Sequence, residues 1–143
     1  MENKLVIIVE DNPDDRELIV RAFKKNSIRS RLVVLNDGVE AIQYLNCEGA
    51  YKDRDIRELP NLIILDIKLP KIDGKEVLKY YRANSYFKNI PIVILSSSSE
   101  RKDIFDTYSF GANSYIKKNI DFSRFLDIIN TTYKYWIEIN ESL

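Results

Sequence analysis

Five short apolar runs alternate with five longer amphipathic stretches along this chain, and no other feature restricts its fold as strongly. Four of the runs consist almost entirely of Val, Ile and Leu, as expected of parallel strands buried on both faces of a sheet. The fifth run is shorter and more polar, which suits a strand at an edge. The predicted strands are residues 4–9, 31–35, 62–65, 91–95 and 113–117.

Each run is followed by a stretch in which apolar residues recur at helical spacing. In the fourth of these stretches Ile104, Phe105 and Tyr108 form the apolar stripe. Five strand-then-helix units predict an α/β fold, a (βα)5 doubly wound parallel sheet with right-handed crossovers and helices on both faces. The predicted helices are residues 14–25, 37–46, 74–83, 100–109 and 121–139, and the last begins at Asp121 as its N-cap.

The length of 143 residues predicts a single domain over 1–143, with no room for a separate output domain. Lysine and arginine number 22 and aspartate and glutamate also 22, so the zero net charge favours neither nucleic acid nor an acidic membrane as a partner. The apolar runs are too short to cross a bilayer, and the N-terminus lacks a secretion signal. A single cysteine suits a reducing compartment, and we expect a cytoplasmic protein.

The chain contains no histidine, which excludes Ser-His-Asp and Cys-His nucleophile activation and most zinc sites. Chemistry must therefore rest on carboxylates, lysines and hydroxyls. In open parallel sheets ligands bind beyond the carboxyl ends of the strands, where the strand order reverses. At that edge the first strand ends on Glu10 and Asp11, the third on Asp66, the fourth on Ser96 and the fifth on Lys118.

With a strand order of 2-1-3-4-5, the first and third strands are neighbours, so Glu10, Asp11 and Asp66 converge. Two unit charges about 4 Å apart repel by roughly 4 kcal/mol at an effective dielectric constant of 20. A divalent cation relieves that repulsion, and carboxylate, carbonyl and water oxygens suit Mg²⁺. With Lys118 as a fixed cation and Ser96 as a hydroxyl donor, the pattern predicts a phosphoryl acceptor whose nucleophile is Asp66.

Each of these residues also has an ordinary explanation when it is taken alone. An aspartate after a strand is commonly a turn or capping residue, and Glu10 and Asp11 before Asn12-Pro13 suit a helix cap. Ser96 opens a run of four serines, and a lone lysine such as Lys118 is usually solvated. The functional interpretation depends on the coincidence of suitable side chains at four strand ends.

The chain resembles the receiver domain of two-component response regulators over residues 4–139. The matching stretches are "VIIVEDNPDDREL", "NDGVEAIQYL", "LIILDIKLPKIDGKEVL", "IPIVILSSSSE" and "GANSYIKKNIDF". The motif "EDNP", the long loop before the third strand and the ending "YKYW" resemble small stand-alone regulators paired with phytochrome-type kinases. The resemblance implies a flavodoxin-like receiver fold and phosphotransfer from a sensor histidine kinase or a phosphotransfer protein. It implies a signalling phosphoprotein rather than an enzyme, with self-catalysed phosphotransfer and slow autodephosphorylation.

The resemblance also assigns roles at the predicted metal site. It makes Asp66 the phosphoacceptor that forms an aspartyl phosphate, and Asp11 a direct ligand of Mg²⁺. Glu10 would hold a metal-bound water, and the backbone carbonyl of Lys68 would complete the protein ligands.

The remaining roles concern the switch from the resting to the phosphorylated state. Ser96 takes the switch hydroxyl position and Tyr115 the switch aromatic, and their movement would change the surface of the fourth helix, fifth strand and fifth helix. The family pattern of an aromatic three residues before the active-site lysine selects Lys118. Strand alternation turns Lys117 to the opposite face, outside the site.

Two positions depart from the family pattern. Asn119 follows Lys118 where the family usually has a proline joined by a cis peptide, and a cis bond there would cost about 2.5–4 kcal/mol, so we expect a trans Lys118–Asn119 bond. Lys68 stands two residues after Asp66, where many receivers have a neutral polar side chain. Its ammonium either hinders water that attacks the phosphoryl group, which prolongs the acyl phosphate, or simply faces solvent.

The last helix has two lines of apolar residues. The first is expected to pack in the core, and the second, on another face, suits a partner chain, which favours a homodimer. The first line is Phe122, Phe125, Leu126, Ile129, Tyr133, Trp136 and Ile137, and the second is Ile128, Thr132, Tyr135 and Ile139.

Three alternatives stay open from the sequence. A haloacid-dehalogenase-like phosphatase also uses an aspartate after a strand with Mg²⁺, but it needs a second aspartate where this chain has Lys68. A mononucleotide- or flavin-binding module would need a glycine-rich loop after the first strand, which is missing. A pseudo-receiver that acts only as an interaction scaffold is favoured by Asn119 and Lys68 and opposed by the intact acidic cluster.

Overall fold

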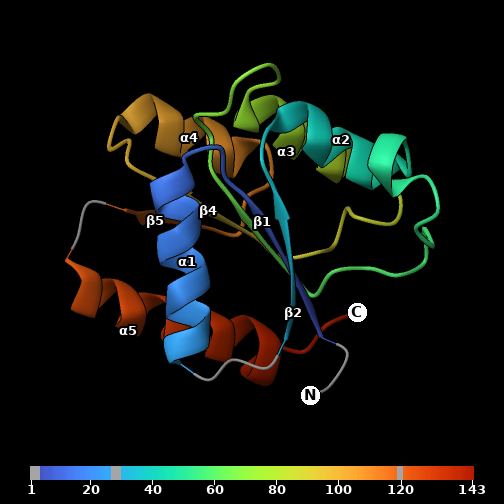
Figure 1. Cartoon of the computed structure of the whole chain (residues 1–143). Coiled ribbons are helices and arrows are strands. Elements are labelled where there is room, and N and C mark those ends of the chain that lie inside the picture. Colours follow the sequence, from blue (N-terminus) through green and yellow to red (C-terminus); the bar gives the residue numbers. More distant parts are fainter. Residues whose placement is uncertain (1–3, 27–29, 119–120) are drawn as a thin grey trace.

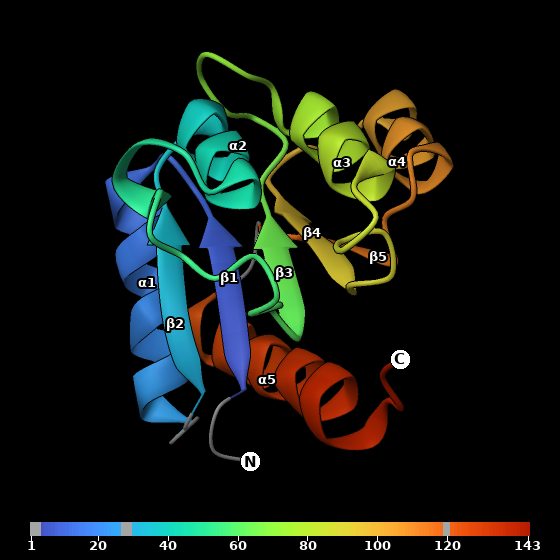
Figure 2. The same ribbon diagram turned by 90° about the vertical axis from the view of Figure 1, so that its right-hand side faces the viewer.

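A parallel five-stranded sheet forms the centre of the molecule in the computed structural model, which describes residues 4–26, 30–118 and 121–143 (Figures 1 and 2). The strand order is β2-β1-β3-β4-β5, so the predicted order and the flavodoxin-like fold are confirmed. Each strand begins and ends within one residue of its predicted bounds. The strands are β1 (Leu5–Val9), β2 (Arg31–Leu35), β3 (Leu62–Leu65), β4 (Ile92–Ser96) and β5 (Ser114–Lys117).

Five α-helices connect and follow the strands, and polar side chains fix where most of them start. The side chains of Asn12, Asp37, Asp73 and Asp121 each accept a hydrogen bond from a backbone amide in the first turn that follows. After α5 the chain continues as a π-helical segment, Lys134–Ile139, so the predicted last helix is helical to its expected end. The α-helices are α1 (Pro13–Lys25), α2 (Gly38–Asn46), α3 (Gly74–Ala83), α4 (Arg101–Ser109) and α5 (Phe122–Tyr133).

Both faces of the sheet are covered, because successive strand residues point to opposite sides. Figure 1 shows α1 and α5 on one face and α2, α3 and α4 on the other. In β1, Val6 and Ile8 pack with the buried residues of α1 and α5, whereas Ile7 and Val9 pack with those of α2 and α3. Burial on both faces explains the near-continuous apolar sequence of the strands.

The fourth helix does not bury the apolar stripe expected from its sequence. Phe105 is 71% exposed, Tyr108 is also exposed, and α4 instead buries Asp103 and Thr107. The carboxylate of Asp103 lies 2.7 Å from the ammonium of Lys75 on α3, so an ion pair takes the place of apolar packing. Phe105 and Tyr108 are therefore left on the surface, whereas Ile104 is partly buried.

The two lines on the last helix are only partly as predicted. Phe125, Ile129, Tyr133 and Ile137 of the expected core line are buried, whereas Phe122 lies at the surface. In the second line Thr132 is buried and Ile128 is partly buried, and only Tyr135 and Ile139 are exposed. Thr132 tolerates burial because its hydroxyl donates to the carbonyl of Ile128 at 2.8 Å.

Gly74 lets the start of α3 pack directly on the loop that follows β3. Its amide donates to the carbonyl of Ile67 at 3.1 Å. A Cβ at this position would lie 2.2 Å from the carbonyl oxygen of Asp66 and 2.4 Å from the Cα of Ile67. Only glycine permits so close an approach, which holds the backbone after Asp66 in place.

Candidate functional site

The register of the sheet brings the carboxyl ends of β1 and β3 side by side. Val9 pairs with Leu65, so the next residues, Glu10 and Asp66, leave the sheet together. The amide of Asp66 donates to the carbonyl of Val9 and the amide of Glu10 to the carbonyl of Leu35, both at 3.0 Å. Backbone hydrogen bonds therefore place both side chains at this edge.

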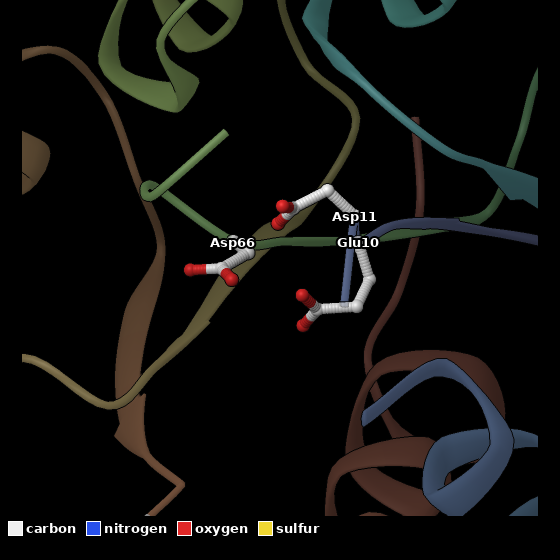
Figure 3. A group of neighbouring side chains, drawn as sticks. All are labelled: Glu10, Asp11 and Asp66. Carbon is white, nitrogen blue, oxygen red and sulfur yellow. The ribbon is translucent and has the colours of Figure 1, made fainter. Parts of the chain in front are cut away.

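Three carboxylates meet there, as the strand order predicts. Glu10, Asp11 and Asp66 each offer an oxygen within 4.8 Å of the others, and Figure 3 shows the three side chains gathered around a common space. Two unit charges at that separation repel by roughly 3–4 kcal/mol at an effective dielectric constant of about 20. Oxygen donors of this kind are the ligands that Mg²⁺ prefers, so the residues present fit this ion.

Burial increases the cost of charge at Glu10. Glu10 is only 1% exposed and Asp66 only 5%. Burial, followed by repulsion from Asp66, raises the pKa of Glu10 to about 8, and the nearby Lys118 opposes this rise only in part. Without a further cation, Glu10 therefore binds a proton readily near neutral pH.

The ammonium of Lys118 lies among the acidic side chains. Its Nζ is 2.6 Å from Glu10 Oε1, 2.8 Å from Asp15 Oδ2 and 3.1 Å from Asp66 Oδ2. Burial alone would lower the pKa of Lys118, but hydrogen bonds to Asp15 and Glu10 and the charge of Asp66 raise it above its usual range. The neighbouring Lys117 is exposed, and the two lysines separate as strand alternation predicts.

Asp15 is a member of this cluster that the sequence did not reveal. It lies in the first turn of α1, where Asp14 and Asp15 follow the N-cap Asn12. Acidic residues are common at helix N-termini because they complement the helix dipole, so the sequence does not distinguish Asp15 from Asp14. The contact with Lys118 depends on how α1 packs against the sheet.

Ser96 and Tyr115 both contact the loop between β4 and α4. Ser96 is completely buried at the end of β4, and its Oγ accepts a hydrogen bond from the amide of Ser98 at 3.2 Å. The half-buried Tyr115 donates its hydroxyl to the carbonyl of Ser98 at 2.7 Å. Ser98 therefore links the two predicted switch positions in this structure.

The same loop is tied to α3 and α4 by Asp103, a second residue that the sequence did not reveal. Its carboxylate accepts a hydrogen bond from Ser98 Oγ at 2.5 Å and pairs with Lys75 at 2.7 Å. The hydrogen bonds from these partners lower the pKa of Asp103, and the bond from Lys75 has a larger effect than the bond from Ser98. Lys75 and Asp103 are 28 positions apart, so no local sequence pattern indicates this arrangement.

Lys68 approaches the site with both its backbone and its side chain. Its amide donates to Asp66 Oδ1 at 3.1 Å, and its exposed ammonium lies 3.7 Å from Asp103 Oδ2. The use of its carbonyl as a metal ligand stays a prediction. The predicted trans bond between Lys118 and Asn119 lies outside the described residues.

No helix within the described parts of the chain has both the length and the apolar character needed to cross a membrane.

Sequence comparison matches residues 6–130 to the family described as response regulator receiver domain. The chain is 33% identical to the response regulator Rcp1 of Synechocystis, over 94% of this chain and 90% of Rcp1.

Similar solved structures include a phosphorylated cyanobacterial phytochrome response regulator, RcpA, with a TM-score of 0.88, 36% identity and 97% coverage of each chain. A Mn²⁺-bound form of Rcp1 has a TM-score of 0.87 and 31% identity and covers 98% of this chain and 99% of that one. The match to the family model and these relatives, together with the strand order, show that the chain belongs to the response regulator receiver domain family and is related to phytochrome response regulators.

Proposed function

We propose that this protein is a phosphoacceptor of a two-component system and that a phosphoryl group is transferred to Asp66. The observation that carries the proposal is the position of the Lys118 ammonium, 3.1 Å from Asp66 Oδ2, beside the three carboxylates that meet within 4.8 Å. An anionic phosphoryl group can approach Asp66 only if cations offset the charge already present. The site supplies one cation as Lys118 and fits a second as a bound divalent ion.

Asp66 acts as the nucleophile of the transfer. One of its carboxylate oxygens forms a bond to phosphorus while the bond between phosphorus and the donor breaks, and the electron pair stays with the donor. The amide of Lys68 holds Asp66 Oδ1 at 3.1 Å, and Lys118 holds Oδ2, so the carboxylate is oriented before the donor arrives.

Asp11 and Asp66 would ligate Mg²⁺ directly, with the carbonyl of Lys68, and Glu10 would do so through a water. A bound Mg²⁺ would act there as a Lewis acid that offsets the negative charge of the pocket and of the transferred group. The buried Glu10 is in direct contact with Lys118, whose ammonium donates a hydrogen bond to Glu10 Oε1 at 2.6 Å.

The phosphorylated state would change the surface of α4, β5 and α5. An aspartyl phosphate adds roughly 1.5–2 negative charges and new acceptor oxygens, towards which the Ser96 hydroxyl can turn. Because Ser96 and Tyr115 are both bonded to Ser98, such a movement reaches the ring of Tyr115 through two hydrogen bonds. The phosphoryl group need only favour one of two existing arrangements of this loop.

The proposed donor is a sensor histidine kinase, of the phytochrome type, or a phosphotransfer protein. The support is the similarity to RcpA, which is described as a phytochrome response regulator. The zero net charge favours neither nucleic acid nor a membrane as a partner, and a cytoplasmic location fits an intracellular kinase.

A second copy of the chain is the further partner we propose. Tyr135 and Ile139 leave apolar area on the surface of the last helix, and Phe105 and Tyr108 do the same on α4. The two groups lie on opposite faces of the sheet (Figure 1), and an exposed apolar patch of either kind is typical of a protein interface.

Phosphorylation with a small donor tests the proposal. The protein would be incubated with acetyl phosphate and Mg²⁺, and intact-protein mass spectrometry would count added phosphoryl groups. We expect one phosphoryl group, which Asp66→Asn or a chelator abolishes and the exposed control Asp14→Asn does not.

The same assay separates the alternatives. A pseudo-receiver scaffold would take up no phosphoryl group under any condition. A haloacid-dehalogenase-like phosphatase would release phosphate continuously without accumulating a stable adduct, but Lys68 occupies the position where that chemistry needs a second aspartate.

A further inference from the structure

Asp15 holds Lys118 from the first turn of α1 and not from a strand end. Its Oδ2 lies 2.8 Å from Lys118 Nζ, and Asp15 is the only one of the three carboxylates around this ammonium that comes from a helix, namely the first turn of α1. Its own amide is held by the N-cap Asn12 at 3.0 Å, which fixes the backbone from which the side chain extends. The side chain of Asp15 is 35% exposed and that of Lys118 only 11%.

The partners of Lys118 fall into two groups. Glu10 and Asp66 belong to the set of three carboxylates that can share one metal ion, together with Asp11, whereas Asp15 is not part of that set within the described residues. A divalent cation at the three carboxylates therefore competes with the Lys118 ammonium for Glu10 and Asp66. It does not compete for Asp15.

We propose that Asp15 is a positioning residue that keeps the Lys118 ammonium at the pocket when a divalent cation takes its place beside Glu10 and Asp66. This inference rests on the proposed function, because it assigns a task to Asp15 within the same phosphoacceptor site. Lys118 remains paired with one carboxylate in both situations, so a buried ammonium is never left without a counter-charge. The ammonium then stays within reach of a phosphoryl group on Asp66.

Asp15 therefore affects metal binding without contacting the metal. If Asp15 is neutral, Lys118 can be neutralised only by Glu10 and Asp66, so an incoming cation must break those ion pairs without compensation. We expect Asp15→Asn to weaken Mg²⁺ binding by about fivefold, which corresponds to roughly 1 kcal/mol for a partly exposed ion pair. The substitution acts through Lys118 although Asp15 is not a metal ligand.

General electrostatics also predicts weaker cation binding when a negative charge is removed, so the experiment must separate the two causes. Asp14 is the matched control, because it is exposed and lies beside Asp15 in the same helical turn. A double-substitution cycle with Lys118→Met isolates the part of the effect that passes through the ammonium.

Isothermal titration calorimetry of the full chain with Mg²⁺ would measure the dissociation constants of the parent, Asp14→Asn, Asp15→Asn, Lys118→Met and Asp15→Asn/Lys118→Met. We expect a marked loss of affinity for Asp15→Asn alone, little change for Asp14→Asn, and little further change when Asp15→Asn is added to Lys118→Met. An equal loss in both backgrounds, or no loss in the parent background, would overturn the inference while leaving the proposed function intact. Absence of Mg²⁺ binding by the parent would overturn both.

A crystal structure with bound Mg²⁺ gives a second measurement that does not depend on the folding of Lys118→Met. We expect Lys118 Nζ to remain within ion-pair distance of Asp15 while it leaves Glu10. A Lys118 side chain turned away from Asp15 in that structure would also overturn the inference.

Discussion

Replacing Lys118 by methionine removes the cation of the acidic pocket while keeping a side chain of similar length. In the metal-free protein this leaves the buried Glu10 and Asp66, and the partly exposed Asp15, without the ammonium that lies 2.6 to 3.1 Å from their oxygens. Removing one partner of a buried ion pair typically destabilises a protein by about 3–5 kcal/mol. Because Glu10 already has a raised pKa of about 8, it takes up a proton easily, which places the expected cost at the lower end.

We therefore expect Lys118→Met to lower the free energy of unfolding by about 3 kcal/mol in the presence of a chelator at neutral pH. For a domain of this size that corresponds to a fall in the melting temperature of roughly 6–12 °C. Mg²⁺ replaces the missing positive charge, and at a concentration about one hundred times its dissociation constant it adds about 2.7 kcal/mol. The variant should thus regain most of the lost stability.

Thermal and denaturant unfolding of the parent, Lys118→Met and Lys117→Met, each with Mg²⁺ and with a chelator, would measure these changes. Lys117 is adjacent but exposed, so its substitution should change the free energy of unfolding by no more than about 0.5 kcal/mol. The reasoning is refuted if the two variants lose equal stability, or if Mg²⁺ stabilises Lys118→Met no more than the parent.

The other predictions concern pH, lifetime and assembly. In the metal-free protein, the stability that depends on protonated Glu10 is fully present below pH 4.5 and is lost as the pH rises through about 8. The rise in melting temperature caused by Mg²⁺ should therefore be larger at about pH 9 than at about pH 6. An equal rise at both pH values would contradict this assignment. Lys68→Asn should speed the loss of the phosphoryl group by up to about fivefold, because an exposed cation contributes at most about 1 kcal/mol. An unchanged or slower decay of the radiolabelled protein would contradict a protective role for Lys68. Tyr135→Glu should convert a dimer into a monomer, as measured by analytical ultracentrifugation. A parent protein that is already monomeric would contradict the proposed homodimer.

The fold was predictable because the buried strands can be recognised in the sequence as continuous apolar runs. A strand that is buried on both faces must be apolar at every position, and Leu62–Leu65 shows this pattern as clearly as any part of the chain. The order of strands and helices then leaves few topologies, and the carboxyl ends of adjacent strands must share one edge. For that reason the convergence of Glu10, Asp11 and Asp66 followed from the sequence alone.

The fourth helix shows where such reasoning fails. Periodicity reports which residues of a helix are apolar, but it does not report which face packs on the sheet. On α4 the buried face carries Asp103, because Lys75 and Ser98 neutralise and bind its carboxylate, and Phe105 is left at the surface. The ion-paired residues Lys75 and Asp103 are 28 positions apart in sequence, so no local pattern predicts their contact.

The contact between Asp15 and Lys118 was unpredictable for the same reason. The two residues are 103 positions apart, and they meet only because α1 and β5 are placed by the sheet. The family spacing selected Lys118, and strand alternation placed Lys117 on the opposite face, because both depend on a single strand. It could not supply the third carboxylate around the ammonium.

The central claim is that a divalent cation occupies the space between the carboxylates of Glu10, Asp11 and Asp66. A crystal of this protein grown with Mn²⁺, which gives an anomalous X-ray signal, tests it most directly. The account predicts a peak of anomalous density in contact with the carboxylate oxygens of Asp11 and Asp66. Anomalous density elsewhere, or none at this edge of the sheet in crystals saturated with Mn²⁺, would contradict it.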